Sequence, residues 1–211
     1  MTTVHIFRQH CWAWLVLLAG LFTPLAQADD AALYGPEAPP GSAFVRMFNA
    51  TPTSLTNASI GGEPVETLDQ FEASDYVFVP AGTHRISTGS EARSESLEAD
   101  RYYTVTVDAG GLQVHSLRPP DDGLKALVVF YNLTADEALQ LKTEDGATPI
   151  AEAGAGVFAT REVNPLRITL GVFSGDRKLA TTEPVNLARG RAFSLFVTPG
   201  RGQPRLTWVI D

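Results

Sequence analysis

The chain has 211 residues, of which 44% are hydrophobic and 19% charged, an ordinary composition for a globular protein. With 16 basic and 24 acidic residues its formal net charge is −8, which makes nucleic acids and anionic membrane surfaces unfavourable partners. The excess of acid lies early: residues 29–123 hold fifteen acidic side chains against five arginines, whereas residues 124–211 hold nine acidic and ten basic ones.

Residues 1–28 have the pattern of a secretory signal peptide. Arg8 precedes an apolar run from Cys11 to Leu25, and Ala26-Gln27-Ala28 supplies a small-x-small cleavage site. The run is shorter than the ~20 apolar residues of a spanning helix, so we expect cleavage, export and no membrane insertion afterwards. Cys11 is the only cysteine, so the remaining 211 − 28 = 183 residues must be stabilised by core packing without disulfide bonds.

Short apolar stretches punctuated by proline and glycine follow the signal. Residues 29–42 predict an extended segment, stiffened by proline. Further along, apolar and polar residues alternate at 102–107 and 206–210, a period typical of β-strands, and pairs such as Gly110-Gly111 mark turns. The pattern predicts an all-β protein, with Trp208 in the core of its second half.

The two halves of the chain resemble each other. Residues 43–49 are similar to 126–132, and residues 97–105 are similar to 187–195. Between the halves lies the turn-rich stretch Arg118-Pro119-Pro120-Asp121-Asp122-Gly123. We therefore predict two tandem antiparallel β-sandwich domains of similar topology, at residues 43–118 and 125–211, joined by a linker at 119–124.

In the first strand of each half both faces are apolar or aromatic, apart from Arg46, which shares one face with Phe44 and Phe48. A sandwich strand with one solvated face alternates between apolar and polar residues, so these two strands must be covered on both sides. Coverage by a loop or by the neighbouring domain is one explanation, and a surface for a partner protein is the other. The residues of such a surface would be Phe44, Phe48, Leu127 and Tyr131, with Leu33 and Tyr34 of the extended segment as a second contact.

No constellation of catalytic residues stands out. There is no G-x-S-x-G elbow, Gly-Asp-Ser block or glycine-rich phosphate loop, and Ser174-Gly175-Asp176 is interpreted as a turn. After the signal only two histidines remain: we expect His84 to pack inward and His115 to face outward. Since cysteine is absent there, no ligand set for a transition metal is apparent, and we predict no catalytic, metal or cofactor site.

The three N-x-S/T triplets, at Asn49, Asn57 and Asn132, are treated as chance.

A family resemblance begins directly after the signal. The run L-Y-G-P-E-A-P-P-G-S-A-F-V-R at residues 33–46 resembles the N-terminal signature of the AlgF family, and looser matches follow at 125–128, 161–165 and 186–190. That family takes part in O-acetylation of alginate, a biofilm polysaccharide. The resemblance implies a periplasmic, non-catalytic protein that works with a membrane acyl-transfer protein (AlgI-like) and periplasmic SGNH-like acetyltransferases (AlgJ-like and AlgX-like).

Three functions therefore compete. The first is an adaptor that binds the acetylation machinery. The second is a carbohydrate-binding module that holds the polymer, for which the near-neutral second half would offer Arg189, Arg191, Arg201 and Arg205 to uronate carboxylates. The third is an acetyltransferase, which would need a nucleophile that the sequence does not reveal.

Overall fold

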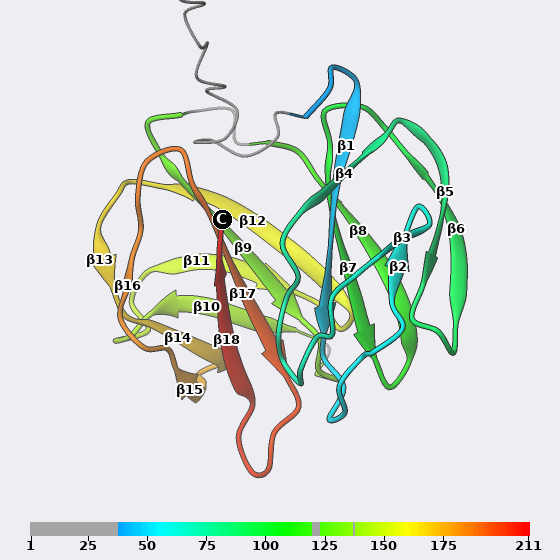
Figure 1. Ribbon diagram of the computed structural model, residues 1–211. Helices are drawn as coiled ribbons and strands as arrows, with labels where there is room; N and C mark the ends of the chain where they lie inside the picture. Colours follow the sequence, from blue (N-terminus) through cyan, green and yellow to red (C-terminus); the bar gives the residue numbers. More distant parts are fainter. Residues whose placement is uncertain (1–37, 120–122, 137) are drawn as a thin grey trace, which may run out of the picture. The chain divides into compact units, whose positions relative to one another are not determined.

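The computed structural model describes residues 38–119, 123–136 and 138–211. These residues form eighteen strands and no helix, so the part described contains no helix that would span a membrane (Figure 1). The predicted signal peptide and most of the predicted extended segment, with Leu33 and Tyr34, lie outside the described residues.

The first sandwich consists of two four-stranded sheets. One has the order β4-β1-β7-β8 and the other β3-β2-β5-β6. Its core lies between the two sheets and includes Val45, Met47, Ile60, Ile86 and Val105. The strands are β1 (Ser42–Asn49), β2 (Ser59–Ile60), β3 (Glu63–Pro64), β4 (Val77–Pro80), β5 (Gly82–Ser87), β6 (Ala92–Leu97), β7 (Tyr102–Asp108) and β8 (Gly111–Leu117).

The second sandwich repeats this arrangement with a small addition. Its sheets have the orders β12-β9-β17-β18 and β11-β10-β14-β15, and a two-stranded sheet, β13-β16, accompanies them. Leu141, Val172, Phe193 and Leu195 lie in its core, against which Trp208 packs as predicted. The strands are β9 (Ala126–Asn132), β10 (Leu139–Thr143), β11 (Pro149–Ala153), β12 (Val157–Val163), β13 (Arg167–Ile168), β14 (Leu170–Ser174), β15 (Arg177–Thr181), β16 (Val185–Asn186), β17 (Ala192–Thr198) and β18 (Arg205–Ile210).

The predicted pair of sandwiches with similar topology is confirmed, down to the register of equivalent strands. β1 and β9 occupy the same place, and each is flanked by an antiparallel strand on one side and a parallel strand on the other. Phe44 lies opposite Tyr102 in the parallel pair β1–β7, and its equivalent Leu127 lies opposite Ala192 in β9–β17. Each central sheet is thus mixed, whereas we had expected antiparallel pairing throughout.

Asn49 and Asn132 end the equivalent strands β1 and β9, and each is a buried asparagine that closes the same kind of turn. The amide of Asn49 donates hydrogen bonds to three backbone carbonyls, at 2.8–3.1 Å, while its oxygen accepts from the backbone N–H and hydroxyl of Thr51. Asn132 makes the corresponding bonds with Thr134 and two carbonyls. Two of the three N-x-S/T triplets therefore have a structural cause: the asparagine satisfies backbone groups that the sheet leaves unpaired.

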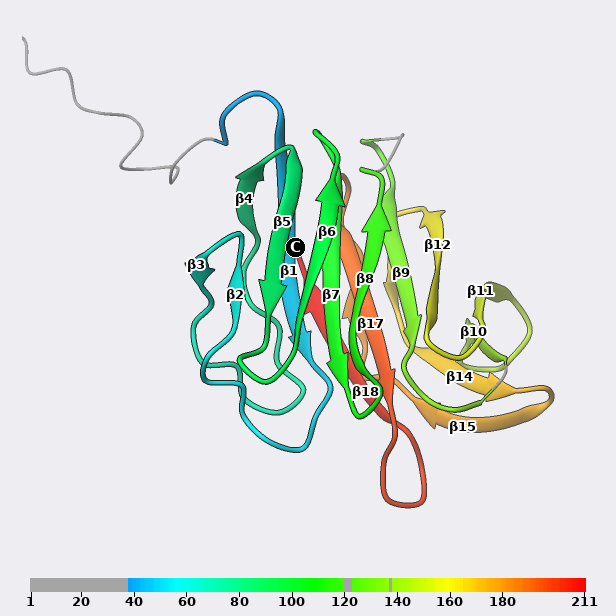
Figure 2. The ribbon, with the colours of Figure 1, turned by 90° about the vertical axis from the view of Figure 1, so that its right-hand side faces the viewer.

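The outer faces of the two central sheets pack against each other. Phe48 stacks on Phe196 with ring centroids 3.8 Å apart, and Tyr131 stacks on the same ring at 4.4 Å. Figure 2 shows β7 and β8 alongside β9 and β17. We call this cluster the junction; its buried members are Phe48, Leu117, Leu127, Val129, Tyr131, Leu133 and Phe196.

The junction decides between the two explanations for the strands that are apolar on both faces. Phe48, Leu127 and Tyr131 are at most 5% exposed because the other sandwich covers them. Phe48, Leu127 and Tyr131 therefore do not form a surface for a separate partner while the two sandwiches are packed together. Phe44 differs from them: it is only partly buried and stacks on Tyr102 at 4.7 Å, so its role in partner binding stays a prediction.

We predict that Asn49→Ala lowers the free energy of unfolding by about 2–4 kcal/mol, because it leaves several buried backbone groups without partners. Urea denaturation followed by tryptophan fluorescence measures this. Asn57→Ala is the matched control, since Asn57 is an exposed asparagine in the third triplet and its loss should change stability by less than about 0.5 kcal/mol. Equal effects of the two substitutions would contradict the assigned role.

Candidate functional site

A buried arginine crosses the junction. Arg46 of β1 is 1% exposed, and its guanidinium group lies about 4.7 Å above the ring of Tyr76. Its Nε donates to the Thr104 hydroxyl at 3.2 Å within the first sandwich. The terminal nitrogens reach into the second sandwich, where they donate to the Ser194 hydroxyl at 2.7 Å and to the Asp211 carboxylate at 2.5 Å. A buried charge needs partners, and here two of the three hydrogen-bond partners come from the other domain.

The alternation of β18 explains how the second sandwich supplies its share. Because side chains alternate between the faces of a strand, Leu206 and Trp208 pack on the core of the second sandwich. Arg205, Val209 and Asp211 lie on the other face, toward the first sandwich. Val209 packs in the junction, and the two charged residues flank it, so a polar contact holds each end of the strand.

Burial shifts the pKa values of the groups around Arg46. Desolvation raises the pKa of the Asp211 carboxyl, although the neighbouring Arg46 charge opposes the shift. It also raises the pKa of the Tyr76 and Tyr131 hydroxyls, which therefore stay neutral at any physiological pH. The groups that surround Arg46 thus combine one ion pair with neutral hydroxyls.

His115 also lies at the junction, which corrects our expectation that it faces outward to solvent. Its side chain does point away from the core of its own sandwich, but the second sandwich covers it, and only 7% of it is exposed. The ring meets Tyr131 and Phe158 edge-on, and its Nε2 is 2.9 Å from the Thr106 hydroxyl. Burial lowers the pKa of His115 to about 4, so the ring is neutral at pH 7.

His84 is only partly buried, so it is not the core histidine that we expected. Its Nε2 lies 2.7 Å from the carbonyl oxygen of Pro80, in an exposed turn.

A groove of about 1050 Å³ opens beside the junction at the start of β18, and residues of both sandwiches line it. Phe71 comes from the first sandwich, while Arg201, Gln203, Arg205 and Trp208 come from the second. Other lining residues are Pro52 and Gln70 from the first sandwich and Thr181, Glu183 and Pro204 from the second. We call it the junction groove.

Phe71 holds an unusual backbone conformation at the rim of this groove. Its φ is +64°, a region that a bulky residue rarely adopts, and its N–H donates to the carbonyl of Asn49 at 2.7 Å. The conformation lets the ring pack on the junction while the guanidinium of Arg205 lies 4.3 Å above it. Such strain of about 1–3 kcal/mol persists where surrounding contacts hold it, often at functional sites.

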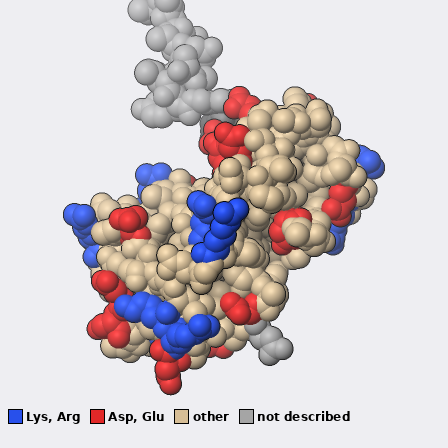
Figure 3. Space-filling model, turned by 90° about the horizontal axis from the view of Figure 1, so that it is seen from below, with Lys and Arg blue, Asp and Glu red and all other residues tan. Residues whose placement is uncertain are grey.

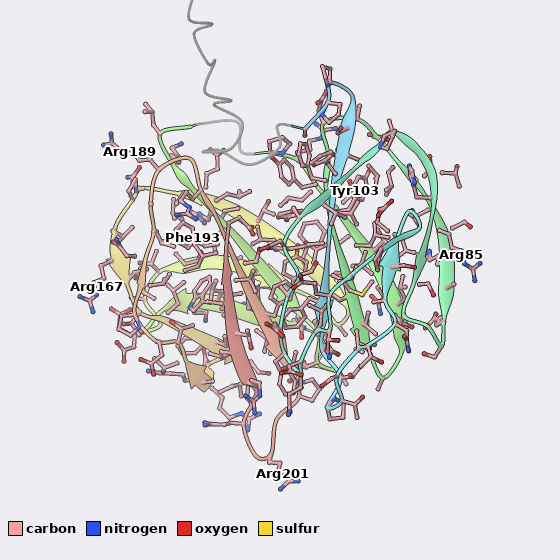
Figure 4. All side chains as sticks on the ribbon, in the orientation of Figure 1. Arg85, Tyr103, Arg167, Arg189, Phe193 and Arg201 are labelled. Carbon is pink, nitrogen blue, oxygen red and sulfur yellow. The ribbon has the colours of Figure 1, made fainter. Side chains whose placement is uncertain are left out.

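The four arginines proposed for glycan binding do not form one site. Arg201 and Arg205 line the junction groove at one end of the β17–β18 hairpin. Arg189 and Arg191 lie at the other end, and Figure 4 shows Arg189 and Arg201 far apart. Arg191 lines a smaller cavity of about 210 Å³ together with Tyr102, and its Nε donates to the backbone oxygen of Asp211.

Charge over the surface around the groove is mixed. The face that contains the hairpin tip, seen from below in Figure 3, carries acidic and basic side chains interspersed with wide uncharged areas. Among the residues described, no group of three or more histidine, cysteine, aspartate or glutamate side chains is placed to hold a metal ion. The features that stand out are therefore the junction with its buried arginine and a groove whose lining contains two arginines and one glutamate.

Comparison with known proteins gives the family. A family model described as "Alginate O-acetyl transferase AlgF" matches residues 16–194, which include most of both sandwiches. The chain belongs to the AlgF family. The "Alginate biosynthesis protein AlgF" of Pseudomonas aeruginosa is 37% identical over 206 residues, covering 96% of this chain and 94% of that protein. The proteins of the same name from Pseudomonas putida and Azotobacter vinelandii are 38% and 36% identical, over 92% and 99% of this chain and 92% and 97% of theirs.

Two solved structures also match. The C-terminal domain of AlgF from P. aeruginosa is 38% identical and covers 42% of this chain and 99% of its own, with a TM-score of 0.38. The N-terminal domain is 29% identical and covers 38% of this chain and 98% of its own, with a TM-score of 0.34. The resemblance to the AlgF family that the sequence suggested is confirmed by the family match.

Sequence reasoning missed two residues of the site. Arg46 was assigned to a partly apolar face, but nothing in the pattern indicated that Asp211 and Ser194, more than 140 residues away, would meet it. Phe71 was not singled out, because the residue type gives no hint of a positive φ. The repeat could have indicated that Arg46 is unusual, because an arginine stands there where the equivalent position of the second half holds the apolar residue Val129.

We predict that Arg46→Met destabilises the folded chain by about 3–5 kcal/mol, since it removes a buried ion pair partner and leaves the partly buried Asp211 carboxylate without the Arg46 charge. Adding Asp211→Asn should restore part of the loss. Calorimetric unfolding should show the two sandwiches melting separately in the single variant. Arg93→Met, which removes an exposed ion pair with Glu95, should change stability by less than about 1 kcal/mol; a similar loss there would count against the junction role.

His115 makes stability depend on pH. Its pKa is about 4 in the folded chain and ordinarily about 6.5, so the unfolded chain binds more protons between these values. The free energy of unfolding should therefore fall as the pH drops from 6.5 towards 4, by up to about 3 kcal/mol. Urea denaturation across pH 4–7 measures this. The slope should largely vanish in His115→Gln and persist in His84→Gln; an equal slope in both variants would contradict the assignment.

Proposed function

We propose that this chain is a periplasmic, non-catalytic adaptor that supports O-acetylation of alginate by binding the acetylation machinery. The observation that carries the proposal is the AlgF relationship, at 36–38% identity over almost the whole chain, with relatives named as alginate biosynthesis proteins. The partners are periplasmic SGNH-like acetyltransferases of the AlgJ and AlgX kind and a membrane protein of the AlgI kind. Export rests on the signal pattern of residues 1–28.

The architecture suits an adaptor because the junction fixes two sandwiches in one arrangement. Aromatic stacking and the Arg46–Asp211 pair leave little freedom for either domain to rotate within the unit 38–211. A surface that both domains share is then already in its binding geometry, and less entropy is lost when a partner docks. The junction groove, with residues from both domains, is such a surface.

Binding of the polymer is the second candidate, and one observation favours it. Arg201 and Arg205 lie together on an open groove, where uronate carboxylates could pair with them. In this case the chain would hold alginate during acetylation instead of holding the enzymes.

The adaptor function is tested in an alginate-producing bacterium from which the gene is deleted. We predict that the polymer then lacks acetyl esters, that the full chain restores them, and that a periplasmic transferase co-purifies with the restored chain. The purified chain alone should release no acetate from a generic acetyl ester. Acetate release that a single Ser→Ala substitution abolishes would make the chain an enzyme, and binding of mannuronate oligosaccharides without any protein partner would favour the polymer-binding function.

A further inference from the structure

The junction groove combines features that select for negative charge. Arg201 and Arg205 are both exposed, and neither forms an ion pair with any described residue. The only acidic side chain in the lining is Glu183. Two arginines and one glutamate give the lining a formal charge of 2 − 1 = +1, opposite in sign to the net charge of −8 of the whole chain.

The side chain of Arg205 is positioned by Phe71, so that it can pair with a carboxylate through two hydrogen bonds. Its guanidinium group lies 4.3 Å above the centre of the Phe71 ring, and this contact reduces the freedom of the side chain, so less entropy is lost when a carboxylate binds. The strained backbone of Phe71 serves this arrangement, because it places the ring of the first sandwich under a side chain of the second. The groove is therefore complete only while the two sandwiches are docked.

The aromatic rings of the groove favour a protein ligand over a sugar polymer. Sugar rings bind to exposed, flat aromatic faces, but Arg205 already covers one face of Phe71. Trp208 is no free platform either, since it is partly buried and packs on the core of the second sandwich. Most of the remaining lining residues are proline, glutamine and threonine, with Pro204 and Gln203 close to Arg205 in sequence, and such a lining suits an extended peptide.

The size of the groove and the charge of the chain restrict the partner further. A volume of about 1050 Å³ is at the upper end of pockets for small ligands, roughly 300–1,000 Å³, and fits several residues of extended chain. A second copy of this protein is disfavoured, because two chains of net charge −8 repel each other. The groove therefore fits a different protein that presents acidic side chains.

We propose that the junction groove binds an extended acidic segment of a protein of the acetylation machinery. Carboxylates of that segment pair with Arg201 and Arg205, and an apolar side chain lies against Pro204 and the rim of Phe71. This inference rests on the adaptor function proposed above, whose partner it assigns to a defined surface.

The test is the affinity of purified full chain for the transferase that co-purifies with it, measured by calorimetry. The variant Arg201→Glu/Arg205→Glu should bind about tenfold more weakly or worse, because it replaces attraction by repulsion. The matched control Arg85→Glu/Arg167→Glu makes the same change of net charge at exposed positions remote from the groove, as Figure 4 shows, and should bind within about twofold of the original chain. Arg201→Glu alone, in the hairpin loop, tests the groove without removing the Arg205–Phe71 stack.

The outcomes separate this inference from the function on which it rests. If the original chain binds no transferase, the adaptor function itself fails. If it binds and both double variants bind equally well, or lose affinity equally, the adaptor function stands and the groove is not the site. Titration with mannuronate oligosaccharides and sedimentation of the chain alone complete the set: groove-dependent binding of the sugar, or groove-dependent self-association, overturns the assignment to an acidic protein segment.

Discussion

The desolvated guanidinium of Arg46 is the constraint on which the arrangement of the two sandwiches depends. An unpaired charge in a protein interior is costly, so the fold must supply hydrogen-bond acceptors around it. Thr104 supplies one from the first sandwich, and Ser194 and Asp211 supply the others from the second. Apolar packing of Phe48 on Phe196 would tolerate small rotations of one sheet over the other, but these hydrogen bonds do not, so the arginine selects one docking geometry.

The internal repeat shows how two similar domains come to form one specific pair. Position 46 is arginine in the first sandwich, and the equivalent position in the second is Val129, which is fully buried in the same junction. If both sandwiches had valine at this position, they would pack through apolar contacts alone. If both had arginine, two positive charges would be buried close together. The asymmetry at this position gives the junction both apolar area and a polar contact that only this pairing satisfies.

Alternation along the sequence was sufficient to predict the strands and their faces, but not what covers each face. It placed His115 correctly on the side away from its own core, yet that side is closed by Tyr131 and Phe158, which lie in the other half of the chain. The same limit applies to Phe48 and Tyr131, whose partners are also distant in sequence. Local periodicity determines the orientation of a side chain, whereas domain docking is a non-local property that no short window contains.

The junction and the groove are coupled because β18 belongs to both. Asp211, directly after this strand, pairs with Arg46, and Arg205, at its start, stacks on Phe71 of the first sandwich. Loosening the contact between the sandwiches at the Arg46 end would therefore also move β18 away from the first sandwich, and with it Arg205 away from Phe71. This holds even though Arg46 lines no part of the groove. Binding at the groove would in turn stabilise the docked arrangement by the same free energy, as thermodynamic linkage requires. If the groove binds a partner as proposed, a substitution deep in the junction would therefore change the affinity for that partner through the position of β18, without touching the ligand.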